Sequence, residues 1–528
     1  MLKGHNLIGF TESAEGKEVV TSFSSVDQQN LPGEFTVATD AEVDEAVAKA
    51  VSAFEVYKRT DAATKAVFLE TIAEEIMALG DTLIQRAMLE TGLPEGRLTG
   101  ERGRTTGQLK LFADLLREGS WVEAVIDPAL PERKPLPRAD LRKMLVPIGP
   151  VAVFGASNFP FAFSTAGGDT ISALAAGNPV IVKAHSSHLG TNELVASAIN
   201  KAAKKCNMPD GIFSTVIGNG YATGMRLVKH PGIKAVGFTG SFNGGMALYK
   251  AAINERETPV PVFAEMSSIN PVLLLPNKIK EEAAKVASQL SGSIALGAGQ
   301  FCTNPGLLFL IDDEPAQKFI KLLTEQLALV PPATMLSPAI ATNYYEGRKA
   351  IAGQAEVSTL FIGDELGNSC KSSTALLQVS AGDFIQNTNL QQEMFGPASV
   401  IVICKDTAEL QQALASLHGQ LTASIFATAD DLQSFAASID QLAGKVGRIL
   451  FNGVPTGVEV CHAMVHGGPF PSTTDARSTS VGADAIKRFV RPLCFQDCPP
   501  ALLPAELKNE NPLNIMRKIN GQFTREQV

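Results

Sequence analysis

Cysteine is scarce in this sequence, with only seven among 528 residues. The number is odd, and only Cys494 and Cys498 lie close together, without a second close pair or a histidine cluster beside them. A disulfide framework and a zinc site are therefore not expected, and we predict that the chain holds no metal. Long apolar runs are also missing, since no stretch approaches the roughly 20 residues that span a bilayer.

The first residues lack the apolar core of a secretory signal, and the chain has no excess of positive charge. We therefore expect a cytoplasmic protein with reduced thiols and no membrane span. The net charge is -9, which argues against a nucleic-acid partner because phosphate binding needs a basic surface. Hydrophobic residues make up 45% and charged residues 19%, the balance of a globular chain, and the length predicts several domains.

The pattern of apolar residues changes along the chain, from helical spacing near the start to alternating strand-like and helical stretches after Arg142. Apolar residues at helical spacing predict three early helices, over residues 40–59 with Asp40 as the cap, 62–80 and about 97–119. After Arg142, short β-branched runs alternate with helical stretches, and a second such series begins at Val260. This alternation predicts βαβ units, and therefore two α/β domains built on parallel sheets.

The first α/β block has features of a nucleotide site, because such sheets bind ligands at the carboxyl ends of their strands. Lys183 ends the apolar run NPVIVK, so its ammonium is expected at that edge. Two loops are rich in glycine, IGNGYATG and GFTGSFNGG, and the second contains Gly240 and Ser241. Neither loop matches the G-x-G-x-x-G fingerprint, so ordinary βα turns and a solvated lysine explain these features equally well.

Three polar residues stand in positions suited to catalysis. Cys302 lies in the loop GAGQFCTNPG, whose small residues let other groups approach a thiol. Glu265 ends the apolar run PVPVFAEM, where burial is expected to raise its pKa toward neutrality, as a general base requires. Asn158, in FGASNFPF, can donate a hydrogen bond to an oxyanion. Ordinary alternatives are a buried apolar cysteine, an ion-paired glutamate and a turn asparagine.

The order of the motifs is more specific than any one of them. FGASNFPF, VIVKAHS, GFTGS, FAEM, GQFCTNPG and QQEMFGP follow one another along the chain. This set resembles the NAD(P)-dependent aldehyde dehydrogenase superfamily, from about Asp40 to Pro492. The resemblance implies two Rossmann-like parallel-sheet domains plus a small oligomerisation arm. It divides the chain into three parts. The NAD(P)-binding domain is discontinuous and comprises residues 1–120 and 142–259, and the catalytic domain comprises residues 260–480. The oligomerisation arm with the C-terminal tail comprises residues 121–141 and 481–528.

The resemblance also implies a role for each matching residue. Cys302 is the nucleophile that forms a thiohemiacetal and, once hydride has passed to nicotinamide, a thioester. Asn158 holds the oxyanion with the Cys302 N–H, and Glu265 activates the hydrolytic water. The expected partners are a small-molecule aldehyde and other copies of the chain, in a homodimer or homotetramer. The implied cofactor contacts are Lys183 at the adenosine ribose, Gly240 and Ser241 at the pyrophosphate, and Glu393 at the nicotinamide ribose.

Several positions depart from the common pattern of the family. Ser157 replaces a tryptophan, EMSS replaces E-L-G-G at Glu265, and the loop VCHAMVHGGPFPSTTD lacks the usual glycine-rich signature. Ser186 stands where NAD-specific members carry a glutamate, and a serine can donate to a 2′-phosphate that a carboxylate would repel. These departures resemble the branch of NADP-linked fatty-aldehyde and α-ketoglutarate-semialdehyde dehydrogenases. Tyr221 replaces an arginine that branch members often carry, so we expect NADP, with NAD as a second cofactor.

Oxidation of α-ketoglutarate semialdehyde is the leading functional hypothesis. One alternative is a medium- or long-chain fatty-aldehyde dehydrogenase, for which Phe163 and Phe301 would line an apolar tunnel. Others are an acylating enzyme that releases acyl-CoA and a non-catalytic relative kept for binding. The intact Cys302, Glu265 and Asn158 favour catalysis, and Glu265 as a hydrolytic base favours release of the acid.

A substrate that carries a carboxylate needs a cation, because a buried carboxylate without a partner is costly. Arg104, Gln108 and Leu111 share one face of a predicted helix, and the corresponding helix of the family borders the substrate tunnel. We therefore predict that Arg104, or else Arg102, meets the substrate carboxylate. Arginines are also common on surface helices, which is the ordinary explanation for both.

Ser186→Glu is expected to shift the cofactor preference from NADP toward NAD. The new carboxylate would repel the 2′-phosphate and accept hydrogen bonds from the ribose hydroxyls. The ratio of kcat/KM for the two cofactors measures this shift. An unchanged ratio would show that Ser186 does not lie at the adenosine ribose.

Overall fold

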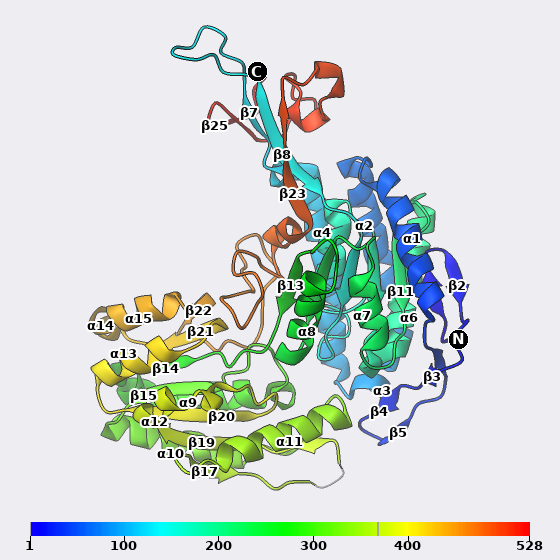
Figure 1. The fold of residues 1–528 in the computed structure, drawn as a ribbon. Helices are drawn as coiled ribbons and strands as arrows, with labels where there is room; N and C mark the ends of the chain where they lie inside the picture. Colours follow the sequence, from blue (N-terminus) through cyan, green and yellow to red (C-terminus); the bar gives the residue numbers. More distant parts are fainter. Residues whose placement is uncertain (1, 367–368) are drawn as a thin grey trace.

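The computed structural model describes residues 2–366 and 369–528. Figure 1 shows two α/β bodies side by side and a narrow arm that projects from the first of them. Two sheets of seven strands and one of five strands organise these parts. No helix within the described ranges is long and apolar enough to cross a bilayer.

The first sheet has a parallel centre and an antiparallel edge. Its strand order is β13-β12-β9-β10-β11-β1-β2, in which β1 and β2 are antiparallel. The chain runs outward from β9 to β11 on one side and later adds β12 and β13 on the other, so a switch point lies at β9. The strands are β1 (Asn6–Ile8), β2 (Thr11–Ser13), β9 (Val151–Phe154), β10 (Val180–Lys183), β11 (Phe213–Val216), β12 (Ala235–Thr239) and β13 (Val262–Glu265).

Helices cover both faces of this sheet and enclose two apolar cores. One face packs against α2 (Ala62–Ala78), α3 (Gly80–Thr91), α4 (Glu95–Glu118), α5 (Gly168–Ala176) and α6 (Leu189–Lys205). The other face packs against α1 (Asp40–Tyr57), α7 (Ala222–Lys229) and α8 (Phe242–Asn254). Parallel strands buried on both sides explain why the sequence shows continuous apolar runs here.

The predicted cap of the first helix was wrong by one residue. Thr39 is the cap: its hydroxyl accepts from the Glu42 N–H at 3.2 Å, and the Glu42 carboxylate accepts from the Thr39 N–H at 2.8 Å. This reciprocal capping box satisfies two helix-end donors, and Asp40 becomes the first helical residue. Helix α3 was not predicted, because Gly80 looked like an end and is instead a positive-φ link between α2 and α3.

The second sheet has the order β17-β19-β20-β15-β14-β21-β22, with only β17 antiparallel among these strands. Its strands are β14 (Val272–Leu274), β15 (Leu307–Ile311), β17 (Ser358–Ile362), β19 (Ala375–Ser380), β20 (Ala398–Cys404), β21 (Gln420–Phe426) and β22 (Val446–Phe451). Helices α9 (Pro276–Ala295) and α10 (Glu314–Ala328) cover one face. The other is covered by α11 (Pro338–Ala352), α12 (Ala381–Gln386), α13 (Thr407–Ser416) and α15 (Ala436–Ala443), with α14 (Ala429–Ser434) between α13 and α15 in sequence.

The arm is a five-stranded sheet drawn from distant parts of the chain, in the order β23-β8-β7-β24-β25. Its strands are β7 (Val125–Asp127), β8 (Leu141–Pro147), β23 (Val490–Gln496), β24 (Arg517–Ile519) and β25 (Gln522–Thr524). Shorter ribbons pair β3 (Val19–Val20) with β6 (Phe35–Thr36), β4 (Phe23–Ser24) with β5 (Gln29–Asn30), and β16 (Ala333–Thr334) with β18 (Lys371–Ser372).

The sheets run across two of the predicted domain divisions. Strand β13 belongs to the first sheet, although the sequence division placed residues from 260 onward in the second domain. Strand β8 belongs to the arm, although the division returned the chain to the first domain at 142. The apolar run KMLVPIGPVAVFG is thus two strands in two sheets, separated at Gly149, whose φ of 121° suits glycine.

Candidate active site

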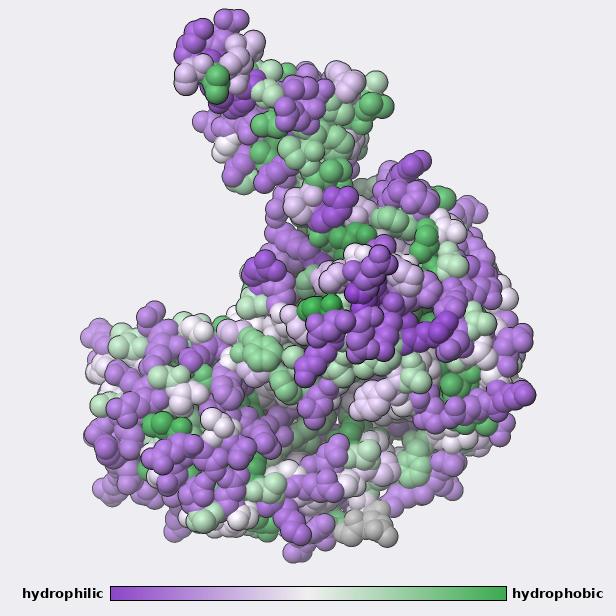
Figure 2. All heavy atoms as spheres, viewed as in Figure 1, coloured by the Kyte–Doolittle hydropathy of each residue, from purple (hydrophilic) through white to green (hydrophobic). Residues whose placement is uncertain are grey.

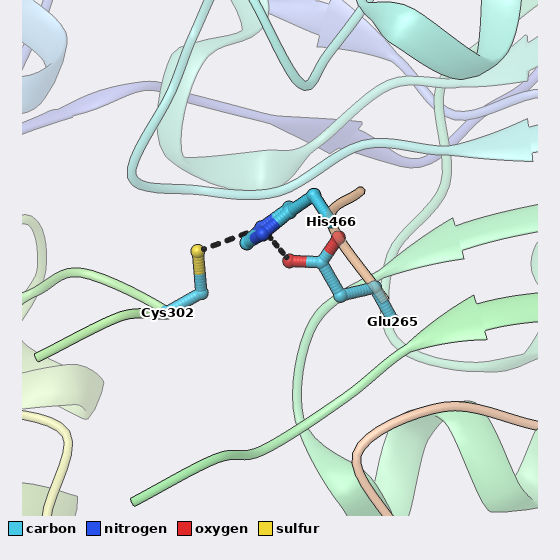
Figure 3. A group of neighbouring side chains, drawn as sticks. All are labelled: Glu265, Cys302 and His466. Carbon is cyan, nitrogen blue, oxygen red and sulfur yellow. Dashed lines mark hydrogen bonds and ion pairs between the residues drawn. The ribbon is translucent and has the colours of Figure 1, made fainter. Parts of the chain in front are cut away.

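Three segments meet where the two α/β bodies adjoin. Glu265 is the last residue of β13, and Cys302 lies in the loop between the short helix η3 (Leu296–Gly299) and β15. The third segment runs over residues 452–482, from β22 back toward the first body, and carries His466. Figure 3 shows the side chains of Glu265, Cys302 and His466 converging from these segments.

His466 lies between the thiol and the carboxylate. Its Nε2 is 3.4 Å from Cys302 Sγ and 2.9 Å from Glu265 Oε1. The contact with Oε1 is close but not aligned as a hydrogen bond, whereas Glu265 Oε2 accepts from the Ser480 hydroxyl at 2.5 Å. His466 and Glu265 are 1% and 4% exposed. The arrangement lets one imidazole nitrogen exchange a proton with the thiol beside a buried carboxylate.

The predicted shift of Glu265 was wrong in direction. Burial raises the pKa of its carboxyl, but the neighbouring His466, Ser480 and Cys302 outweigh burial, so the pKa is lowered overall. The sequence showed the apolar neighbours of Glu265 and not these distant partners. Burial and the adjacent Glu265 charge raise the pKa of Cys302 well above its usual range. The resting thiol is therefore neutral and needs a base in contact with it.

The same trio has the composition of a metal site. The donor atoms of Glu265, Cys302 and His466 all lie within 4.8 Å of one another. A carboxylate, a thiolate and an imidazole are also ligands that zinc accepts. The expectation that the chain holds no metal therefore stays a prediction.

Asn158 lies against the loop that carries the thiol. It follows β9, and its Nδ2 donates to the Gln300 carbonyl at 2.9 Å, two residues before Cys302. The amide has a second N–H, and the Cys302 N–H donates to no other backbone or side-chain group among the described residues. These donors have the chemistry of an oxyanion hole. Arg97 holds the Asn158 segment, because its Nη2 donates to the Asn158 carbonyl at 2.5 Å.

Two further residues fix the thiol loop. Asn270 has a φ of 44°, a left-handed conformation, and its Nδ2 donates to the carbonyls of Cys302 at 2.8 Å and Asn304 at 2.9 Å. Gly299 has a φ of 67°, and a Cβ there would lie 2.2 Å from the backbone of Gly396. The loop therefore approaches the segment after Glu393 closely, which only glycine permits.

The predicted cofactor residues Lys183, Ser186, Gly240 and Ser241 follow strands β10 and β12 of the first sheet. Lys183 ends β10, is half-buried, and makes no hydrogen bond or ion pair with any described residue; burial lowers its pKa. Ser241 caps α8 by accepting from the Gly244 N–H at 3.2 Å, beside the exposed Gly240. An unpartnered lysine and a helix N-terminus suit a ribose and a pyrophosphate. Ser186 is exposed, three residues beyond Lys183.

Glu393 lies near the loop that carries Cys302. Glu393 and Phe301 both line a narrow cavity. Burial raises the pKa of the Glu393 carboxyl to about 7, although the Ser267 hydroxyl and the Ser268 N–H bind it. Nearby, Phe163 and Phe301 are buried, and both pack against Phe159. The Phe163 ring also lies 6.1 Å from the His466 ring. Phe163 thus lies beside His466 and Phe301 precedes Cys302 in the chain, and their contact with a substrate stays a prediction.

The two arginines that were predicted to meet the substrate carboxylate, Arg104 and Arg102, point to different surroundings in the structure. Arg104 lies against Phe163, and its charge interacts with Cys302 and Glu265. Arg102 turns away and donates to the Gly80 carbonyl at 2.8 Å, so the alternative at Arg102 was wrong. Arg102 and Arg104 are two residues apart, and such residues do not share a helix face.

Sequence reasoning missed His466 and Arg97. His466 stands in the loop VCHAMVHGGPFPSTTD, which was seen only as a departure from the family pattern. A titratable residue beside two glycines was the available signal. Arg97 lies seven residues before Arg104, with Glu101 between them, and this spacing places all three on one helix face.

The comparisons with known proteins agree with this geometry. A model described as "Aldehyde dehydrogenase family" matches residues 10–491. The chain is 50% identical over 522 residues to alpha-ketoglutaric semialdehyde dehydrogenase 2 of Azospirillum brasilense, and 46% identical over 522 residues to the alpha-ketoglutaric semialdehyde dehydrogenase of Acinetobacter baylyi. In both cases 99% of each chain is covered.

Solved structures share the fold. A betaine aldehyde dehydrogenase from Staphylococcus aureus has a TM-score of 0.79 at 17% identity, covering 94% of this chain and 97% of that one. An NADP-dependent glyceraldehyde-3-phosphate dehydrogenase from Bacillus halodurans has a TM-score of 0.78 at 20% identity, covering 94% and 99%. At these identities the likeness concerns the fold, and it confirms the predicted α/β class with parallel-sheet domains.

The affinity for NAD is expected to fall as the pH is lowered through 7. Glu393, with its pKa raised to about 7, is predicted to accept hydrogen bonds from the nicotinamide ribose, and only its ionised form is a pure acceptor. Between about pH 8 and pH 6 the loss should be about tenfold. NAD is the better probe because the 2′-phosphate of NADP titrates in the same range. Glu393→Gln should bind NAD more weakly and without this pH dependence; an unchanged profile in that variant would contradict the assignment.

Proposed function

The chain belongs to the aldehyde dehydrogenase family, and we propose that it oxidises α-ketoglutaric semialdehyde to α-ketoglutarate with NADP or NAD. The contact of Cys302 Sγ with His466 Nε2 carries the chemical part of this proposal, because it gives a neutral, half-buried thiol a base. The two relatives named for this semialdehyde support the substrate, since they match over 99% of the chain. The fatty-aldehyde alternative has no comparable support.

The first step is attack of the thiol on the aldehyde carbon. His466 Nε2 takes the thiol proton, the S–C bond forms, and the carbonyl oxygen becomes an oxyanion. Glu265 Oε1, 2.9 Å from the same nitrogen, stabilises the imidazolium. The second N–H of the Asn158 amide and the Cys302 N–H donate to the oxyanion. A positive charge held beside a buried carboxylate costs less than one held alone.

The thiohemiacetal then loses hydride and becomes a thioester. A bound NAD(P)+ would supply the hydride acceptor for this step. Lys183, Ser186, Gly240 and Ser241 would hold its adenosine and pyrophosphate portion, and Glu393 would hold its nicotinamide ribose. Glu265, which is ionised because its pKa is lowered, next accepts a proton from water as the water oxygen attacks the thioester carbon. The C–S bond breaks, the acid leaves, and Cys302 recovers its proton, so that water and the aldehyde yield the acid, one reduced cofactor and one proton.

The arm supports assembly into a homodimer or homotetramer. It is a small sheet that projects from the first body, with β23 and β25 at its edges. Figure 2 shows apolar side chains mixed with polar ones on its surface. A projecting sheet with free edges is suited to adding strands from another copy. The cytoplasm is the proposed compartment, in keeping with seven cysteines that are all free thiols.

A substrate panel tests the proposed function. The purified enzyme should oxidise α-ketoglutaric semialdehyde with a higher kcat/KM than pentanal or hexanal, followed by formation of NADPH or NADH. Cys302→Ala should retain less than about one part in a thousand of this activity. A preference for long alkanals would establish the fatty-aldehyde alternative, and a requirement for coenzyme A would establish an acylating enzyme.

Substitutions of His466 and Glu265 are expected to slow different steps of the reaction most strongly. His466→Asn should slow the first burst of reduced cofactor by about 10²–10⁴-fold, the usual contribution of a general base. Glu265→Gln should retain a burst of one equivalent, slowed less than in His466→Asn by the loss of the carboxylate beside the imidazolium, and should then stall at the thioester. Stopped-flow absorbance of the reduced cofactor separates the two phases. His462→Asn, at an exposed position of the same loop, is the matched control and should leave both phases unchanged. A full-speed burst in His466→Asn would show that another group activates the thiol.

A further inference from the structure

One face of helix α4 carries a stripe of polar side chains at helical spacing. Arg97, Glu101, Arg104 and Gln108 lie four, three and four residues apart, so they share that face. Glu101 and Gln108 are 5% and 1% exposed. Elsewhere the buried positions of the helix are mostly apolar, such as Leu98, Leu109 and Phe112. Two cations in such a setting require a partner or a function.

The Arg104 guanidinium lies on aromatic walls and has open donors. Its central carbon is 5.0 Å from the Phe163 ring centroid and 5.8 Å from that of Phe159. Its Nε and Nη2 are buried, yet neither has a hydrogen-bond partner among the described residues. The aromatic rings stabilise the cation without occupying its N–H groups, which lie in the plane of the guanidinium group.

Arg97, at the N-terminal end of this helix face, packs against two rings of the group Phe159, Phe163 and Phe301, which we call the aromatic wall. Its guanidinium carbon is 4.8 Å from the Phe159 ring and 4.9 Å from the Phe301 ring, so Phe159 contacts both arginines. Nη2 is held by the Asn158 carbonyl, but Nη1 is buried without a partner within the described ranges. Arg104 interacts with the Cys302 thiol itself, whereas Arg97 lies over the ring of Phe301, the residue that precedes Cys302.

The charges on this wall do not balance. Glu101 is the buried carboxylate that interacts with both arginines, and its Oε1 already accepts from the N–H groups of Phe161 at 2.8 Å and Ala162 at 3.0 Å. Glu459, which also acts on Arg104, is exposed. The other buried carboxylate that acts on Arg104, Glu265, is already in contact with His466 and Ser480. Arg97 and Arg104 therefore share Glu101 on this helix face and keep buried N–H groups open to a further negative charge.

We propose that Arg104 and Arg97 form a subsite for the far carboxylate of an aldehyde acid, with Arg104 as the principal ligand. The inference rests on the proposed function, since it places the aldehyde end of the same molecule at Cys302. Arg448, a third arginine near the thiol, does not belong to this subsite. Its guanidinium donates to the carbonyls of Pro455 at 3.0 Å and Gly457 at 3.2 Å, so it holds the loop that carries His466.

The first experiment compares two five-carbon substrates that differ in charge. Arg104→Met should lower kcat/KM for α-ketoglutaric semialdehyde about 10- to 150-fold, which corresponds to a lost hydrogen bond to a charged group. The value for pentanal should change little. Arg104→Lys should recover part of the loss, because lysine restores the positive charge but lacks the paired N–H donors of a guanidinium group. Arg102→Met, on the same helix but bound to Gly80, controls for the loss of an arginine and should affect both substrates equally. An equal loss on both aldehydes in Arg104→Met would overturn the subsite.

The second experiment needs no turnover and separates the subsite from the proposed function. In the inactive Cys302→Ala protein, α-ketoglutarate is titrated by calorimetry with and without the added change Arg104→Met. The subsite predicts that the added change weakens binding about 10- to 150-fold; equal affinity would overturn it. If the acid binds through Arg104 but the native enzyme does not oxidise the semialdehyde, the subsite stands and the proposed function fails.

Discussion

The pairing of β13 with the returning segment is the constraint on which the site depends. Strand β13 is an edge of the first sheet, and residues 472–474 add to it as an antiparallel bridge opposite Glu265. The Met266 N–H donates to the Ser472 carbonyl at 2.8 Å, and the Thr474 N–H to the Ala264 carbonyl at 3.1 Å. This pairing fixes the segment that carries His466 and Ser480 against Glu265. The site therefore forms only when the second body is folded against the first.

Much of the architecture could be predicted because it depends on patterns of apolar residues that are local in the sequence. The alternation of apolar runs and helices gave two parallel sheets, and the motif order brought Cys302, Glu265 and Asn158 into consideration; the structure places all three together. The errors have local causes as well. A proline-flanked glycine, Gly149, divides one apolar run between two sheets, and no periodicity distinguishes that case from one long strand.

The electrostatics of the site could not be predicted in the same way. The apolar neighbours of Glu265 in sequence indicate burial, and burial alone raises a carboxyl pKa. The groups that lower it instead, His466 and Ser480, lie in a loop about two hundred residues away and reach Glu265 only through the bridge to β13. Titration behaviour is a property of the assembled contacts, whereas the identity of a nucleophile in a glycine-rich loop is visible in the chain itself.

The aromatic wall illustrates how one set of residues can support opposite substrate hypotheses. Phe159, Phe163 and Phe301 fit an alkyl tunnel when considered alone, and burying each methylene would contribute about 0.8 kcal/mol. In the structure the same rings carry Arg97 and Arg104. An alkyl chain laid over them would keep three buried nitrogen donors from water, namely Arg97 Nη1, Arg104 Nε and Arg104 Nη2.

The magnitudes decide between these hypotheses. Each buried donor without a partner costs about 1–3 kcal/mol, so three of them offset roughly four to eleven methylenes of apolar gain. A carboxylate removes that cost and accepts a bidentate pair of charged hydrogen bonds from one guanidinium. The rings then act mainly to exclude water and to stabilise the cations, which makes a short aldehyde acid a better match to these residues than a long alkanal.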